Sequence, residues 1–214
     1  MLEPLTRAKF EQLISPIATG EQYAHYWGKW QDLINRLLIS VVAVIVVLIL
    51  GFALGEAARD LVLMIAVIAG LYWLWSPVYW ASVRNRQARR FKYSGFWRGR
   101  ILDIFITEDL IGKEETVNQR GELVVVENRE RRINLVLGDR SGFEVTIQAP
   151  LKRIHKSLKV GQTAELLVLS NRFDLATIDK VTDAYIPSQN LWIGSYPWLQ
   201  RDVFIEVSRE LSNY

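Results

Sequence analysis

The chain has 214 residues, which is enough for one membrane unit and one modest soluble domain. It contains no cysteine, which excludes disulfides, thiolate metal sites and cysteine nucleophiles. The net charge of +3 is unevenly divided, because residues 1–100 hold 12 basic and 6 acidic side chains whereas residues 101–214 hold 14 basic and 17 acidic ones. Basic charge therefore gathers where anionic lipid head groups could attract it, and the acidic C-terminal half argues against nucleic-acid binding.

Residues 1–36 have the pattern of an interfacial amphipathic segment. Apolar side chains recur at helical spacing over 10–17 and again over 23–30, and a proline and a glycine separate the two stretches. We expect two short helices or turns on the membrane surface, with Trp27 and Trp30 at the membrane interface.

Residues 37–83 predict a transmembrane hairpin of two helices. Leu37–Leu54 is uncharged and covers roughly 27 Å as a helix, close to the hydrocarbon thickness of a bilayer. A six-residue polar turn, GEAARD, separates it from a second uncharged run, Leu61–Val83. We expect two antiparallel helices, with Pro77 kinking or ending the second one.

Two sets of residues in the hairpin have expected roles. Aromatic side chains favour the head-group level of a membrane, and they crowd the second half of the second run; contact with chlorophyll, carotenoid or quinone is the alternative role. Small residues four apart allow close helix contact, either within the hairpin or with a partner helix. The aromatic set is Tyr72, Trp73, Trp75, Tyr79 and Trp80, and the small set is Gly51, Gly55, Ala66 and Gly70.

A basic block without any acidic residue follows the second run, over 84–100. Cationic segments next to a membrane span remain on the cytoplasmic side, so we expect both termini to be cytoplasmic or stromal. We interpret the block as a juxtamembrane linker whose side chains set topology and contact anionic lipid. The residues assigned this role are Arg84, Arg86, Arg89, Arg90 and Lys92, and Arg98 and Arg100 complete the block.

Residues 101–214 predict a small all-β domain on the cytoplasmic side. Short alternating stretches replace the long apolar runs, and glycine-containing turns such as GDRSG at 138–142 separate them. Five or six short strands in about ninety residues suggest an OB-like or SH3-like barrel. The expected strands are Gly99–Ile106, Glu122–Glu127, Arg132–Leu137, Phe143–Ile147, Ala164–Leu169 and Ala176–Tyr185.

The tail of the domain predicts a C-terminal helix. Pro197 suits the first turn of a helix, and Leu199, Val203, Val207 and Leu211 then form one apolar stripe. This helix is expected to pack on the barrel, the membrane or a partner, with Trp192 and Trp198 as possible docking residues. We interpret Phe105, Phe143 and Phe173 as core residues, and the cluster of Lys152, Arg153, His155, Lys156 and Lys159 as a solvated or membrane-facing surface.

No catalytic motif is present. The sequence has no glycine-rich phosphate loop, no paired-histidine metal motif and no nucleophile elbow, so we expect neither an enzyme nor a small-molecule substrate. The two spans contain no ionisable residue, which argues against a transporter. His25 could ligate a magnesium or another metal, but an interfacial polar role is the simpler interpretation. Because the first thirty residues lack a signal-peptide pattern, we expect the mature protein to begin near Met1.

Three stretches together carry a resemblance to a known group of proteins. HYWGKW precedes the hairpin, and LKVGQTAELLVLSNR and IPSQNLWIGSYPWLQRDVFIEVSREL lie in the distal domain. The combination resembles a family of uncharacterised cyanobacterial and chloroplast thylakoid membrane proteins. The resemblance implies a factor that assists assembly or stabilisation of a photosystem, photosystem II being favoured. Its partners would be integral membrane photosystem subunits or other assembly factors; a permanent accessory subunit is the alternative.

Overall fold

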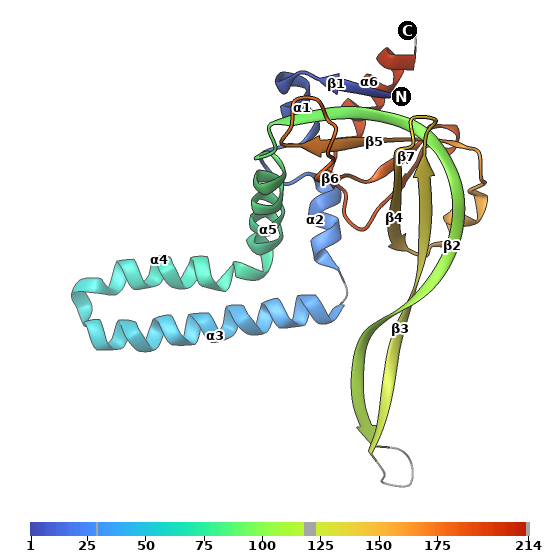
Figure 1. Cartoon of the computed structure of the whole chain (residues 1–214). Helices are drawn as coiled ribbons and strands as arrows, with labels where there is room; N and C mark the ends of the chain where they lie inside the picture. Colours follow the sequence, from blue (N-terminus) through green and yellow to red (C-terminus); the bar gives the residue numbers. More distant parts are fainter. Residues whose placement is uncertain (29, 118–122, 213–214) are drawn as a thin grey trace. The chain divides into compact units, whose positions relative to one another are not determined.

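The computed structural model describes residues 1–28, 30–117 and 123–212, and the chain divides into two compact units. A sheet unit contains Met1–Phe10 and Phe91–Tyr214, and a helical unit contains Glu11–Arg90 (Figure 1). The first ten residues therefore contribute to the sheet unit, although the sequence places them in an interfacial segment.

The helical unit consists of helices joined by short turns. The two short N-terminal helices predicted from apolar spacing are present as α1 and α2. Helix α3 and helix α4 run side by side in opposite directions, joined by a 3-10 turn at Glu56–Ala58 (Figure 1). The helices are α1 (Arg7–Leu13), α2 (Gly20–Trp27), α3 (Trp30–Leu54), α4 (Arg59–Gly70) and α5 (Tyr72–Ala88).

The second apolar run, Leu61–Val83, is divided between two helices. Helices α4 and α5 meet at Leu71 with a bend of 71°. The sequence predicts the disturbance at Pro77, but Pro77 lies inside α5. The prediction of its position is therefore wrong by about one and a half helical turns, because side chains near Leu71 stabilise a break there.

The sheet unit contains one antiparallel sheet of eight strands and a C-terminal helix, α6 (Arg201–Ser212). Two more 3-10 turns lie at Arg153–Ser157 and Pro187–Gln189. The strands are β1 (Leu2–Leu5), β2 (Tyr93–Val117), β3 (Leu123–Gly138), β4 (Glu144–Pro150), β5 (Thr163–Ser170), β6 (Lys180–Val181), β7 (Ala184–Ile186) and β8 (Leu191–Ile193).

The predicted OB-like or SH3-like barrel is wrong, because the sheet is open. Its strand order is β4-β3-β2-β5-β7-β8, and in the described part of the chain the terminal strands β4 and β8 are not paired with each other. Strand β2 is much longer than the strand predicted at Gly99–Ile106, and it changes neighbours along its length. Its first part pairs with β1 and β5, and its register with β3 begins at Arg100.

Strands β2 and β3 continue as a two-stranded ribbon beyond the rest of the sheet (Figure 1). The last β4 partner on β3 is Arg132, whereas the β2–β3 register runs on to Val117 opposite Leu123. Register shifts between Ile101 and Asp103 and between Leu110 and Gly112 indicate bulges, which bend a strand and increase its twist. The sequence predicts two separate strands, Glu122–Glu127 and Arg132–Leu137, where β3 is continuous; Glu122 itself lies outside the described residues.

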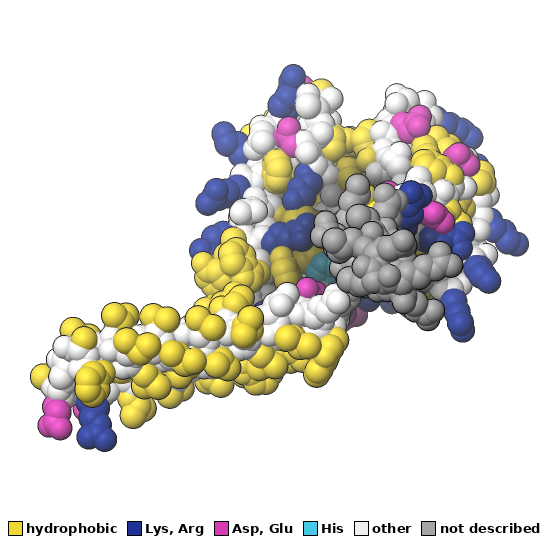
Figure 2. All heavy atoms as spheres, turned by 90° about the horizontal axis from the view of Figure 1, so that it is seen from below, with side chains coloured by type: hydrophobic (Ala, Val, Ile, Leu, Met, Phe, Trp, Pro, Cys, Tyr) yellow, Lys and Arg dark blue, Asp and Glu magenta, His cyan; other side chains and the backbone are white. Residues whose placement is uncertain are grey.

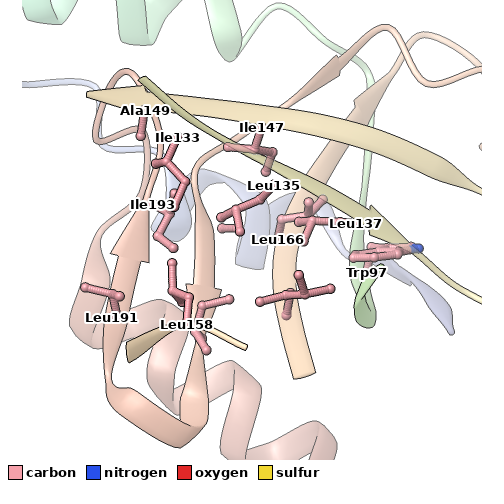
Figure 3. Close-up of a cluster of buried hydrophobic side chains, with 14 of the residues drawn as sticks. Trp97, Ile133, Leu135, Leu137, Ile147, Ala149, Leu158, Leu166, Leu191 and Ile193 are labelled. Carbon is pink, nitrogen blue, oxygen red and sulfur yellow. The ribbon is translucent and has the colours of Figure 1, made fainter. Parts of the chain in front are cut away.

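The core of the sheet unit is one cluster of buried hydrophobic side chains that several strands contribute (Figure 3). Trp97, Leu135 and Leu166 are fully buried within it. Of the three phenylalanines interpreted as core, Phe143 packs against this cluster. The other two interpretations are wrong, because Phe105 and Phe173 are 43% and 81% exposed.

Several local predictions in the sheet unit can be compared directly with the structure. The 138–142 turn is confirmed, since the Asp139 amide donates to the Phe143 carbonyl at 3.1 Å. The single strand expected over Ala176–Tyr185 is instead the two short strands β6 and β7. The C-terminal helix is confirmed, but it begins at Arg201, four residues after Pro197.

The basic block at 84–100 is regular secondary structure over most of its length. Its first part is the end of α5, and its last part belongs to β2 from Tyr93 onward. Arg98, near its end, pairs with Glu165 of β5 at 2.8 Å and donates to the Ser208 carbonyl of α6 at 3.1 Å. This cation therefore stabilises the sheet unit internally.

Candidate membrane-facing site

Helices α3 and α4, here called the apolar helix pair, present apolar side chains to the outside. Only 6% of the most apolar window of α3 is buried, and Phe52 is 94% exposed. Figure 2 shows hydrophobic side chains along the length of the pair, with charged groups at its tip. Among the described residues, α3 is the single helix that is long and apolar enough to cross a membrane by itself. Helices α4 and α5 meet that criterion only when they are taken together.

Close packing within the pair depends on two of the four small residues predicted for that role. A Cβ added at Gly51 would lie 2.5 Å from Val62 of α4, and one at Gly70 would lie 3.3 Å from Val44 of α3. Gly55 has open space around it and a φ of +78°, so its role is the turn. Ala66 is half-buried and lines the same groove as Gly51.

Side chains satisfy the backbone groups that the α4–α5 break exposes. The Trp73 amide donates to Ser40 Oγ at 3.1 Å, and that hydroxyl donates to the Arg36 carbonyl at 3.0 Å. On the other side of the break, Trp75 Nε1 donates to the Ile68 carbonyl at 2.9 Å. Ser40, the one hydroxyl of the Leu37–Leu54 run, is thus a hydrogen-bonding partner for a backbone group that lipid could not satisfy.

The predicted interfacial aromatics form two groups on the helical unit. Edge-to-face contacts link Tyr72, Trp75, Tyr79 and Trp80 along α5, with ring centroids 5.2–6.0 Å apart. Trp75, Tyr79 and Trp80 are exposed, as a belt at a membrane surface requires.

The second aromatic group joins α2 to the start of α5. Trp27 contacts Tyr23 and Trp73, with centroid distances of 5.7 and 6.0 Å, and both tryptophans are half-buried. Trp30, at the first position of α3, is 71% exposed. Trp27 and Trp73 therefore have a packing role, whereas Trp30 is free to contact surrounding molecules.

The five predicted head-group cations differ in their contacts. Arg89 donates to the carbonyls of Glu11 and Ile14 at 2.9 and 2.7 Å and pairs with the Glu11 carboxylate at 3.3 Å, so it caps the end of α1. Arg84 is half-buried. The side chains exposed on this surface are Arg86, Arg90 and Lys92.

A buried polar pair between α2 and α5 has no counterpart among the predicted sites. Gln22 and Asn85 are both fully buried, and their amides exchange two hydrogen bonds of 2.9 and 2.7 Å. Gln22 also completes a capping box with Thr19. The spacing of Thr19 and Gln22 was the available signal, since it marks the start of a helix and the residue that bonds back to it.

The two tryptophans considered for partner docking lie inside the sheet unit. Trp198 is 6% exposed, and Lys180 Nζ lies 3.6 Å from its ring centroid. Trp192 is half-buried between Tyr185 and Phe204, with ring centroids 4.8 and 5.3 Å away. Their contacts are those of packing residues, which leaves little of either ring for a partner.

The basic cluster at 152–159 is mostly exposed. Lys152, Arg153, Lys156 and Lys159 face solvent, whereas His155 is buried and its Nδ1 accepts the Lys152 amide at 3.2 Å. Burial and the neighbouring Lys152 charge lower the pKa of His155. The histidine therefore has a structural role in the 3-10 turn.

Asp183 is the acid with the most unusual environment. Burial raises its pKa from 3.8 to about 7, and its Oδ1 accepts the Trp198 amide at 3.0 Å. This contact anchors the chain that precedes α6. Among the described residues, no three His, Cys, Asp or Glu side chains are grouped so that they could hold a metal ion.

Comparison with known families assigns the chain to one of them. A family model described as a family of unknown function, DUF8619, matches residues 3–213. The chain belongs to this DUF8619 family. Searches of curated proteins and of solved structures found no match. The DUF8619 match covers both units, so the helical unit and the sheet unit belong to the same family.

Proposed function

We propose that this DUF8619 protein is a membrane-bound, non-catalytic assembly or accessory factor that the apolar helix pair holds in the bilayer. The exposed apolar surface of α3 carries the proposal. The core helix of a soluble protein would be mostly buried, whereas only 6% of the apolar window of α3 is covered. Lipid or partner helices are the surroundings in which this surface is stable.

The path of the chain supports a returning span. The run Leu37–Leu54 crosses roughly 27 Å, and the charged tip follows it. Helix α4 has 12 residues and covers only about 18 Å, but the Trp73 amide lies against Ser40, one turn inside the start of that run. The bent α4–α5 pair thus returns to the level where the polar part of α3 begins.

Charge supports an orientation with both ends of the hairpin on the cytoplasmic side. Arg36 precedes the first run, and Arg86, Arg90 and Lys92 are exposed after the second. The tip, GEAARD, carries two acids and one base, which leaves it without a basic excess. An excess of basic residues near the ends of spans favours the cytoplasmic side.

The ribbon of β2 and β3 supports a protein partner for the sheet unit. A two-stranded ribbon is only marginally stable in water by itself. Leu110, which lies in the ribbon, and Leu102, Phe105 and Ile106, which precede it on β2, are each more than 40% exposed. The edge of an extended strand and nearby apolar side chains are the features that strand addition from a partner uses.

The resemblance stated above supplies the specific client for this proposal. It points to a thylakoid membrane and to photosystem subunits, with photosystem II first. The alternative within the same proposal is a permanent accessory subunit, which would be recovered in near-stoichiometric amount with the mature complex.

Membrane attachment is tested by flotation of the full chain with phospholipid vesicles. Ile49→Arg places a charge within the apolar run of α3, where it costs up to about 3 kcal/mol, so the partition coefficient between vesicles and water should fall by up to about a hundredfold. The matched control is Phe173→Arg, at an exposed apolar position of the sheet unit, which should float like the wild type. Equal flotation of both variants would contradict the attachment.

The client is tested by photocrosslinking in native membranes. A photoreactive residue at Phe52 should capture an integral membrane protein, and one at Phe105, on β2 just before the ribbon, should capture a partner on the cytoplasmic side. Photosystem subunits among the products support the assembly role. Products containing only further copies of this chain would contradict it.

A further inference from the structure

A groove of about 520 Å³ lies between α3 and α4, next to the charged tip of the apolar helix pair. Its walls include Gly51 of α3 and Ala66 of α4. A volume of this size falls within the range of about 300–1,000 Å³ that holds small ligands, so the groove has room for an aromatic ring. Lipid tails are as apolar as these walls, so hydrophobicity alone does not select a protein for the groove; matching shape and polar contacts do.

Phe52 is a projecting side chain at the edge of the groove. It lines the groove, yet it is 94% exposed, the highest fraction among the large hydrophobic side chains that the structure describes. Its neighbour Gly51 faces Val62 on the opposite helix, because a Cβ added at Gly51 would lie 2.5 Å from that valine. Phe52 therefore lies at the level along the helices where Gly51 and Val62 line the groove, since one residue of a helix rises only about 1.5 Å. One surface thus offers a projection and a depression at the same level.

Two opposite charges lie at the tip end of the same groove. Glu56 and Arg59 both line it, and both residues are exposed. Within the part of the chain that the structure describes, no ion pair involves either side chain. An acid and a base on one surface are self-complementary, because a second copy turned about a two-fold axis can set each Glu56 against the Arg59 of the other copy.

A two-fold axis parallel to the membrane normal brings these features together. Such an axis keeps every residue at its own depth in the bilayer, so Phe52 of each copy reaches the other copy at the level of its groove, and the opposite charges meet at the tip. We propose that the α3–α4 groove is a dimer interface, in which the groove of one copy receives Phe52 of a second copy of this chain. The shared depth rests on the proposed membrane attachment.

Sedimentation equilibrium of the full chain in a density-matched detergent measures the dissociation constant of this dimer. Phe52→Ala removes the projecting ring from both copies and should raise the dissociation constant by about 30-fold or more. Ala66→Leu fills the groove and should also weaken the dimer. The matched control is Ile49→Ala, which shortens a side chain on the same helix that is 65% exposed but does not line the groove, and it should dimerise like the wild type.

The charged pair allows a rescue experiment. Glu56→Arg and Arg59→Glu each set like charges against one another across the axis, so each should weaken the dimer by about tenfold. The double variant Glu56→Arg/Arg59→Glu restores both attractions with the charges exchanged, and its dissociation constant should return close to the wild-type value. Additive losses in the double variant would show that these two residues do not meet in the dimer and would overturn the proposed axis.

The remaining outcomes separate the other occupants of the groove. A monomeric wild type would overturn the proposal and would leave the groove to lipid or to a helix of another protein. A dimer that neither Phe52→Ala nor Ala66→Leu weakens would overturn this interface. Flotation of Phe52→Ala with vesicles should match the wild type, so loss of the dimer is distinguishable from failure of membrane attachment. In the crosslinking experiment above, a second copy should appear among the products at Phe52, beside client subunits.

Discussion

Ser40→Ala removes the acceptor that the α4–α5 break requires. The hydroxyl accepts the Trp73 amide at 3.1 Å and is itself 3% exposed, so water cannot replace it easily. Hydrogen bonds inside membrane proteins average about 0.6 kcal/mol, and a buried donor left without an acceptor costs about 1–3 kcal/mol. The variant should therefore lower the local opening free energy by roughly 0.6–3 kcal/mol, which corresponds to about 3-fold to 150-fold faster exchange.

Hydrogen exchange of the full chain in lipid nanodiscs measures this change. Amide exchange over 71–76 should accelerate in Ser40→Ala, while exchange in β5 stays unchanged. Ser40→Thr keeps a hydroxyl at the same position and should restore most of the protection. If Ser40→Ala exchanged like the wild type over 71–76, the hydroxyl would not stabilise the break, and the account of how the bent span is held in lipid would be refuted.

Three further changes test other parts of the structure. Gly51→Leu should destabilise the apolar helix pair by about 1–3 kcal/mol because the new side chain meets Val62. Denaturation of the detergent-solubilised chain measures this loss. Wild-type stability would show that the helices can separate freely. Arg98→Ala should destabilise the sheet unit by about 3–5 kcal/mol because it leaves the Glu165 carboxylate buried and unpaired; a shift in unfolding midpoint too small to resolve would contradict this pairing. Burial raises the pKa of Asp183 from 3.8 to about 7, so the folded state retains a proton that the unfolded state releases. The contribution of this proton to the free energy of unfolding is full below about pH 4 and is lost as pH rises to about 7. Asp183→Asn should abolish this pH dependence. Parallel pH–stability profiles of the wild type and the variant would contradict the prediction.

The sequence was most informative where a long pattern had one physical explanation. The uncharged run Leu37–Leu54 predicts a helix whose apolar side chains are unfavourable in water. Helix α3 contains the whole run. Small residues four apart, Gly51 with Gly55 and Ala66 with Gly70, indicate close packing, and a Cβ added at Gly51 or Gly70 would meet the opposite helix. These features depend on local composition and on neighbours along one helix.

The misses depend on contacts between distant residues. The α4–α5 break is stabilised by Ser40, which lies thirty-three residues before Trp73. A contact at that distance is not visible in the local sequence, so the break was predicted at Pro77 instead. The barrel was predicted from the number of short strands, but closure depends on whether the first and last strands pair. The Gln22–Asn85 pair escaped prediction because its two residues lie 63 positions apart and come together only through the fold.

The position of the apolar helix pair in the bilayer is tested most directly by cysteine accessibility, since the chain has no native cysteine. Single cysteines at Ile49, Leu63 and Phe173 replace side chains that are 65%, 60% and 81% exposed in the isolated chain. In vesicles, Ile49→Cys and Leu63→Cys should resist a water-soluble maleimide until denaturing detergent is added, whereas Phe173→Cys should react at once. Reaction of Ile49→Cys and Leu63→Cys as fast as Phe173→Cys in intact vesicles would contradict the central claim that this pair is buried in the membrane.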